Sequence, residues 1–261
     1  MTLDSRNVRL YEATWPEFAE RLSQGWVSVL VPLGATEQHG YHLPLSTDCD
    51  IAAAVAERAA KVLGYCFVTP TIPIGCSDHH MGFSGSMTFA EDTLVAVLHD
   101  VCRSMARHGF KNVFLTSGHA GNVPAMRRAL SEMQGASLAC RVEGLVDWGR
   151  YRDPLYAIAE RHGLTRRRAG SHGGHYETSV MRRLRSDLVH MERSRPGLIN
   201  EPDLAGRALR AQGMAAISPD GVIGDPTSAT EAAGEEYLQA MTQTIVTAFQ
   251  EAFVSSETAA N

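Results

Sequence analysis

Short apolar runs alternate along this chain with alanine-rich or amphipathic segments. Runs of the first kind are typical of buried strands, and segments of the second kind are typical of helices. The pattern predicts strands at 26–33, 66–74, 112–116 and 137–146, and helices at 14–24, 50–63, 91–108, 123–134, 176–184, 204–212 and 230–253. Strands and helices that take turns predict an α/β fold, with a mainly parallel sheet covered by helices on both faces.

Length and composition favour one domain. The chain has 261 residues, of which 44% are hydrophobic, enough to bury one large core. It carries no low-complexity run, long charged block or internal repeat that would mark a linker or an array. We therefore expect residues 1–261 to form a single domain.

Charge and cysteine content argue against several classes of protein. The formal net charge is −5, without the basic footprint of nucleic-acid binding, so no nucleic-acid partner is expected. The five cysteines include no Cys-x-x-Cys pair, which argues against a disulfide framework. The apolar stretches are too short to span a membrane, and the first residues lack the apolar core of a signal peptide. We expect a cytoplasmic protein with no membrane partner.

The segment "TEQHG" follows the first expected strand and carries Glu37 and His39, with Asp48 shortly after it. In an extended segment alternate residues point to the same side, so Glu37 and His39 can face one spot while Gln38 faces away. Carboxylate and imidazole ligands suit zinc, manganese or iron better than calcium. A metal site is the first hypothesis, and a surface turn is the alternative.

Two further polar clusters strengthen the metal hypothesis. "SGHAGN", with His119, follows the strand expected at 112–116, and "SHGGHYETS" contributes His172 and Glu177. Ligand sites of open α/β sheets lie beyond the carboxyl ends of the strands, which is where these clusters fall. One shared site explains the three clusters better than three unrelated turns.

The strings "PLGATEQHGYHLPLSTD", "GHAGN" and "HGGHYETS" resemble the signatures of the creatininase family, the creatinine amidohydrolases, in their order and approximate spacing. The resemblance covers residues 14–230, nearly the whole chain. It implies a three-layer α/β/α fold, a homohexamer, and a binuclear metal centre that hydrolyses an amide or related C–N bond. The implied cofactors are two divalent metal ions per chain, zinc first, with manganese or iron as alternatives.

Matching the family motifs residue by residue implies a role for each polar side chain. Glu37, Asp48 and His119 correspond to ligands of one metal ion. His39 and Asp48 correspond to ligands of the other, so Asp48 would bridge the pair.

The resemblance also implies the last ligand and the proton carrier. Creatininase takes a further carboxylate from two residues after the matching histidine, where this chain has Gly121. Family members with Gly-His-x-Gly-Asn take it from the later Glu-Thr-Ser motif, which implies Glu177 as a ligand that takes part in catalysis. His172 matches the family histidine that moves protons near the scissile bond.

Substrate-contacting residues are expected in the same region. Trp148 lies at the spacing of a tryptophan that covers the substrate in creatininase, whereas Arg168 replaces the second such tryptophan. An arginine suits a carboxylate or phosphate better than a flat heterocycle, which argues against creatinine. We expect Trp148, Arg168, His80 and Gly173 to contact the substrate.

The expected reaction is hydrolysis of a non-peptide amide, in a small linear or cyclic substrate, by a hydroxide that bridges the two metal ions. His172 then protonates the leaving nitrogen, because an imidazole titrates near neutral pH. Three alternatives stay open. They are a short-peptide peptidase like the mycofactocin-maturation branch, which "HGGHYETSV" resembles, a catalytically inactive metal-binding protein, and a phosphate-binding module, which the clustered acids disfavour.

Overall fold

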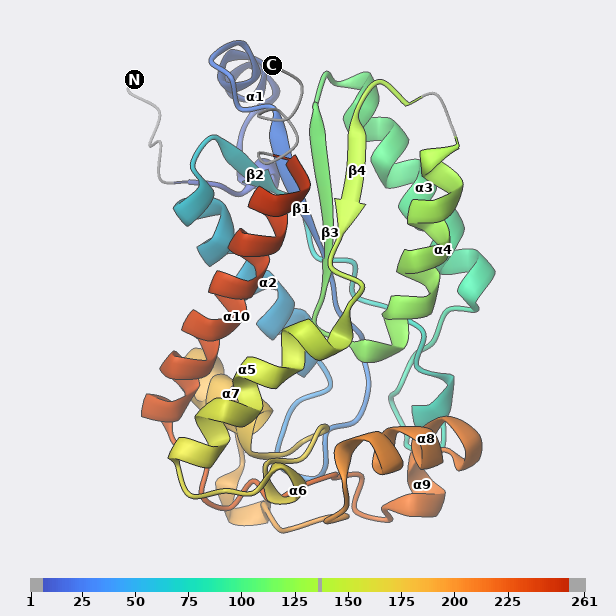
Figure 1. Cartoon of the computed structure of the whole chain (residues 1–261), viewed down its shortest axis with the longest axis vertical. Helices are drawn as coiled ribbons and strands as arrows, with labels where there is room; N and C mark the ends of the chain where they lie inside the picture. The colour runs from blue at the N-terminus through green and yellow to red at the C-terminus, as the bar shows by residue number, and fades with distance from the viewer. Residues whose placement is uncertain (1–6, 136–137, 254–261) are drawn as a thin grey trace.

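The computed structural model of the chain describes residues 7–135 and 138–253. At its centre lies a parallel sheet of four strands in the order β2-β1-β3-β4 (Figure 1). The strands are β1 (Ser28–Leu33), β2 (Cys66–Val68), β3 (Asn112–Ser117) and β4 (Arg141–Gly144). Because all four strands are parallel, their carboxyl ends meet at one edge of the sheet.

Helices cover both faces of the sheet, as the alternating pattern predicts. On one face α2 (Thr47–Leu63) packs against β1, β2 and β3 and against α10 (Glu231–Phe253). On the other face α3 (Glu91–Arg107) packs against α4 (Val123–Gln134), which contacts β4. Figure 1 shows α2 and α10 to the left of the sheet and α3 and α4 to the right. The expected three-layer α/β/α architecture is confirmed.

The main core lies between these layers. β1 and β3 each bury every residue after the first, because helices cover both faces of the sheet. Phe67, Phe110 and Phe114 are among the largest fully buried side chains, and each stabilises the fold by about 2–3 kcal/mol through burial.

Several element boundaries differ from those expected, and two of these differences have a physical reason or affect the site. β2 ends at Val68 rather than at residue 74, because Pro70 and Pro73 have no N–H to donate to a sheet. α2 begins at Thr47 rather than at residue 50, so that Asp48 lies in the first turn of this helix. The expected start of the last strand at Ser137 lies outside the described residues.

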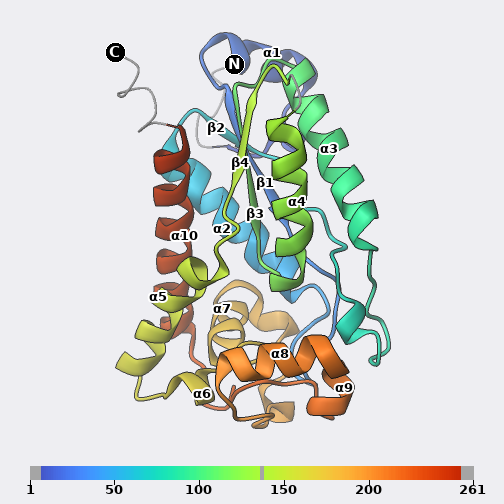
Figure 2. The ribbon, with the colours of Figure 1, turned by 45° about the vertical axis from the view of Figure 1, so that its right-hand side comes forward.

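Beyond the carboxyl ends of the strands, the chain forms a cap of helices (Figure 2). These are α5 (Trp148–Arg161), α6 (Arg166–Ala169), α7 (His175–Arg185), α8 (Pro202–Gln212) and α9 (Met214–Ile217). α5 is not predicted from the sequence, because Pro154 lies inside it, where proline normally breaks a helix.

The remaining elements are short. α1 (Trp15–Ser23) begins with a capping box of Thr14 and Glu17 and lies at the opposite end of the sheet from the cap. Single 3-10 turns occur at Leu10–Glu12, Asp78–His80, Ala120–Asn122, Ser186–Leu188 and Met191–Arg193. Within 7–135 and 138–253, no helix has the length and hydropathy needed to cross a bilayer.

Candidate metal centre

The residues implied as metal ligands converge beyond the carboxyl ends of β1 and β3. They come from the loop after β1, the first turn of α2, the residue that precedes the 3-10 turn after β3, and the first turn of α7. All of these side chains are buried: Glu37, His39, Asp48, His119 and Glu177.

The first group of possible ligands consists of Glu37, Asp48 and His119, whose ligand atoms all lie within 4.8 Å of one another. His119 Nδ1 is 3.3 Å from Glu37 Oε1 and 3.3 Å from Asp48 Oδ2. Atoms at these separations can share one divalent ion, because metal–ligand bonds to nitrogen and oxygen are about 2.0–2.2 Å long.

The second group consists of His39, Asp48 and Glu177, again with ligand atoms within 4.8 Å of one another. His39 Nε2 is 3.2 Å from Asp48 Oδ1 and 3.9 Å from Glu177 Oε2. Asp48 therefore turns one oxygen toward each group, Oδ1 toward His39 and Oδ2 toward His119. This is the arrangement that a bridging carboxylate requires.

Backbone carbonyls orient the two histidines of these groups. His39 Nδ1 lies 3.1 Å from the carbonyl oxygen of Glu37, and His119 Nε2 lies 3.1 Å from that of Cys76. A carbonyl only accepts hydrogen bonds, so these nitrogens carry protons and donate. The nitrogens that face the carboxylates are then available as ligands, which is the usual arrangement of metal-binding histidines.

Four buried polar atoms of the cluster have no hydrogen-bond partner within the described part of the chain. They are both carboxylate oxygens of Glu37, Nε2 of His39 and Oδ2 of Asp48. Each unsatisfied buried group costs about 1–3 kcal/mol, so four at one place require an explanation. Two divalent cations would satisfy them together, and the residues therefore fit a two-metal centre.

The electrostatics of the cluster also favour bound cations. Burial, opposed by the charge of His119 and reinforced by that of Asp48, raises the pKa of Glu37 to about 7. Burial opposes a charge on His39 and His119, but the surrounding carboxylates, Asp48 foremost for His39 and Glu37 for His119, raise their pKa values to about 10 and about 9. Divalent ions would displace these protons, because metals bind neutral imidazole.

Glu177 is held in place by two donors. The backbone N–H of Gly173 donates to Oε2 at 2.5 Å, and the hydroxyl of Tyr176 donates to Oε1 at 2.6 Å. Gly173 has a φ of +59°, a conformation that favours glycine. Gly173, which the sequence predicts as a substrate contact, thus orients a carboxylate of the cluster.

The structure gives a steric reason for the glycine at position 121. A Cβ atom on Gly121 would lie 2.2 Å from Nε2 of His119 and 2.4 Å from the carbonyl oxygen of Cys76. A side chain here would displace the His119 ring. A carboxylate at this position is thus incompatible with the present geometry, whereas Glu177 reaches the cluster beside His39.

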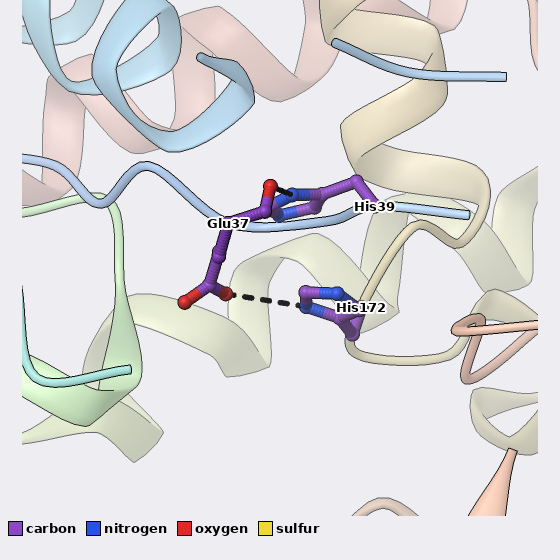
Figure 3. A group of neighbouring side chains, drawn as sticks. All are labelled: Glu37, His39 and His172. Atoms are coloured by element: carbon purple, nitrogen blue, oxygen red, sulfur yellow. Dashed lines mark hydrogen bonds and ion pairs between the residues drawn. The ribbon is translucent and has the colours of Figure 1, made fainter. Parts of the chain in front are cut away.

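His172 lies on the loop before α7, with its ring stacked on that of His39 at a centroid distance of 4.1 Å. Its Nδ1 is 3.7 Å from Glu37 Oε1, the contact marked by the dashed line in Figure 3. Burial, reinforced by the charge of His39, holds the pKa of His172 well below its usual range. Glu37, His39 and His172 also offer ligand atoms within 4.8 Å of one another, so the geometry admits His172 as a ligand as well as a proton carrier.

His80, expected at the substrate, is buried with Nε2 3.3 Å from Glu37 Oε1. Gln38 does not face away from the site: its side chain lies against His80 and His172. The expectation fails because the segment after β1 is not a regular strand. β1 ends at Leu33, and residues 34–38 belong to no strand, so the alternation of side chains does not extend to Gln38.

A cavity of about 800 Å³ opens beside the cluster of candidate ligands. Its wall includes Cys76, whose carbonyl holds His119, and Ser171, which precedes His172. Trp148 also lines this cavity, where the sequence places a substrate contact.

The structure does not bring Arg168 to this cavity. Its guanidinium pairs with Asp225 at 2.5 Å, its side chain is 57% exposed, and it is absent from the described residues that line the wall. The arginines of the wall are Arg152 and Arg210, which the sequence reading missed. Arg152 follows Trp148 by one helical turn. This spacing places both residues on one face of a helix, but α5 was not expected from the sequence.

Comparisons with known proteins agree with the family resemblance. The family described as creatininase, creatinine amidohydrolase, matches residues 11–249. The mycofactocin precursor peptide peptidase of Mycobacterium ulcerans is 36% identical over 233 residues, which cover 85% of this chain and 84% of that protein. The creatinine amidohydrolase of Pseudomonas putida is 28% identical and covers 95% of this chain and 98% of its own length.

Solved structures lead to the same family. The crystal structure of creatinine amidohydrolase matches with a TM-score of 0.78 and 28% identity, over 95% of this chain and 98% of that one. Similar structures include a creatininase mutant of Zn-Zn type, with a TM-score of 0.75, and a form named creatininase Mn, with a TM-score of 0.76. This chain, with its buried cluster of candidate metal ligands, belongs to the creatininase family of hydrolases.

Proposed function

We propose that this chain is a two-metal amidohydrolase. The observation that carries the proposal is the position of Asp48, which turns one oxygen toward each of two buried ligand groups. When bound, two divalent ions would bring the pKa of a water between them down to about 7 and polarise the carbonyl of the amide. Zinc is the first candidate and manganese the second, and iron suits the same ligands.

Different residues of the cluster hold the two ions and carry the proton. Glu37, Asp48 and His119 hold one ion, and His39, Asp48 and Glu177 hold the other. His172 is neutral and turns Nδ1 toward Glu37, so Nδ1 can take a proton from the attacking water. The same nitrogen then donates this proton to the leaving nitrogen of the amide, as the sequence predicts for a general acid.

A short peptide is the substrate class that the cavity favours. Its volume of about 800 Å³ is ample for several residues, and two guanidinium groups line it. Arg152 donates from Nη2 to Asp203 at 3.1 Å, but its Nε is buried without a hydrogen-bond partner among the described residues, and Arg210 lines the same wall. Guanidinium groups match carboxylates, so a peptide that ends in a carboxylate suits this wall. The similarity to mycofactocin precursor peptide peptidases supports the same choice.

Acidic residues in the same wall confine the attraction of anionic groups to the surroundings of the two arginines. Asp78 and Glu91 also line the cavity, and Glu91 lies 3.8 Å from Arg128 outside it. The cavity is thus not cationic throughout. An anionic group would be drawn to the arginines and away from Asp78.

A small non-peptide amide, linear or cyclic, is the second candidate. The place of Trp148 in the wall favours it, since an aromatic ring can cover a flat substrate, and so does the similarity to creatinine amidohydrolase. A hydrolysis screen separates the candidates. Zinc- and manganese-loaded protein is assayed against creatinine, other cyclic amides, formamides and short peptides.

We expect peptide hydrolysis that a chelator abolishes and added metal restores. Faster turnover of creatinine than of any peptide would overturn the peptide assignment. A protein that holds both ions and hydrolyses nothing would instead be the catalytically inactive metal-binding protein.

The family resemblance supports two further proposals, a single domain and a homohexamer. Sedimentation equilibrium of the metal-loaded chain tests the second. A mass of six chains is expected, and a monomer at micromolar concentration would contradict it.

A further inference from the structure

We propose that Gln38 is a positioning residue that fixes which ring nitrogen carries the proton in His80 and in His172. The inference rests on the proposed function only in treating His172 as the proton carrier. Gln38 is buried, and its side-chain Nε2 lies 3.0 Å from Nδ1 of His80 and 3.2 Å from Nε2 of His172. It is thus the one residue of the loop after β1 that touches both rings through its amide.

A backbone donor fixes the orientation of the Gln38 amide. The N–H of Gly40 lies 3.0 Å from Oε1 of Gln38. A backbone N–H only donates, so the atom it faces is the carbonyl oxygen, and the amino group is the one that faces the histidines. Gly221 packs against the same amide: a Cβ atom there would lie 2.1 Å from Oε1. The glycine at 221 therefore leaves the space that this side chain occupies.

The amide then determines the tautomer of His80. The amino group of Gln38 only donates, so Nδ1 of His80 accepts and the ring proton lies on Nε2. That nitrogen is 3.3 Å from Glu37 Oε1, one of the carboxylate oxygens implied as a metal ligand. His80 thus presents an N–H edge, rather than a lone pair, to Glu37.

The backbone carbonyl of Gln38 determines the tautomer of His172. Its oxygen lies 2.6 Å from Nε2 of His172, a distance at which two lone pairs would repel. Nε2 therefore carries the proton, and the amino group of Gln38 lies beside this N–H without bonding to it. The lone pair on Nδ1 of His172 is left facing Glu37, where a proton carrier is required.

Gln38→Glu separates this role from simple packing, because the two side chains have nearly the same shape. A carboxylate can still accept from Gly40 but cannot donate to His80. We expect the proton of His80 to move to Nδ1, with both metal ions retained. Turnover should fall by about 10–100-fold with little change in KM, as for other residues that orient a metal site. Gln24→Glu, on the exposed end of α1, is the matched control.

The test is nitrogen NMR of histidine-labelled, zinc-loaded protein, in which the shifts of Nδ1 and Nε2 report the tautomer directly. His80→Asn and His172→Asn assign the signals. In the unsubstituted protein we expect the Nε2–H tautomer for both rings, and the Nδ1–H tautomer of either ring would overturn the proposal. An unchanged His80 tautomer in Gln38→Glu would do the same. Because this readout needs no substrate, it remains decisive even if the chain hydrolyses no amide.

Discussion

The imidazole rings of His39 and His172 lie stacked, with their centroids 4.1 Å apart and their planes inclined by 26°. His39 faces the carboxylates of Asp48 and Glu177, whereas His172 is held by the carbonyl of Gln38. Like charges this close repel strongly in a buried site, so a cation bound by His39 would keep His172 neutral. The stacking is thus consistent with the proposed roles of the two adjacent histidines, His39 as a ligand and His172 as the proton carrier.

Replacing His172 tests this division. We expect His172→Ala to keep both metal ions and to lose turnover by about 10²–10⁴-fold, the usual contribution of general acid–base catalysis. Metal analysis and steady-state kinetics are compared with those of His190→Ala, an exposed histidine. Unchanged turnover would remove the proton-carrier role, and loss of one ion would make His172 a ligand.

Substrate recognition is tested at Arg210. Arg210→Gln should raise KM about 10-fold for peptides that end in a free carboxylate, because a hydrogen bond to a charged group contributes about 1.5–3 kcal/mol. Peptides with an amidated C-terminus should be unaffected. Arg207→Gln, exposed on the same helix, is the control. An equal effect on both kinds of peptide would rule out carboxylate recognition by Arg210.

Glu235 should make stability depend on pH. It accepts hydrogen bonds from Arg58 of α2, at 2.6 and 3.0 Å, and from Arg183 of α7, and these arginines, Arg58 foremost, lower its pKa to about 2. A carboxylate with a lowered pKa in the folded state adds stability above its unfolded pKa, and this stability is lost as the pH falls toward 2. Because the side chain is 33% exposed, solvent screening limits the gain to about 1 kcal/mol or less.

The measurement is the free energy of unfolding of Glu235→Gln by chemical denaturation. The variant should be less stable than the parent at pH 7, and the difference should shrink between pH 5 and pH 3. Glu231→Gln, at the exposed start of the same helix, should match the parent throughout. A deficit that does not change with pH would mean that packing, and not charge, is responsible.

The layered fold could be predicted because strand and helix patterns differ locally. Buried parallel strands are apolar throughout, and the covering helices are amphipathic or rich in alanine. α5 could not be predicted, because Pro154 breaks the local helix pattern. The helix is stabilised by its packing against α10, which the local sequence does not show. Pro70 and Pro73 indicate that β2 ends early, but the apolar residues around them extend the strand pattern to residue 74. The end at Val68 was therefore not predicted.

Within the site, residue type and position after a strand were enough to select side chains that the structure brings together, such as Glu37 and His119. Their roles as ligands stay predictions. The direction of Gln38 could not be predicted, because this residue lies beyond the end of β1 and its side chain is held by a hydrogen bond from the Gly40 N–H. The pairing of Arg168 with Asp225 joins distant segments, which no local pattern encodes.

The metal content of Asp48→Asn tests the central claim most directly. Protein reconstituted with zinc is analysed for metal per chain and titrated against a competing chelator. The control is Asp50→Asn, which replaces a carboxylate that accepts a hydrogen bond from Ser46. We expect two ions per chain in the parent and in Asp50→Asn. In Asp48→Asn both sites should weaken by about 100-fold or more, because one shared carboxylate serves both. Two ions bound with unchanged affinity in Asp48→Asn, or the weakening of one site alone, would contradict a centre bridged by Asp48.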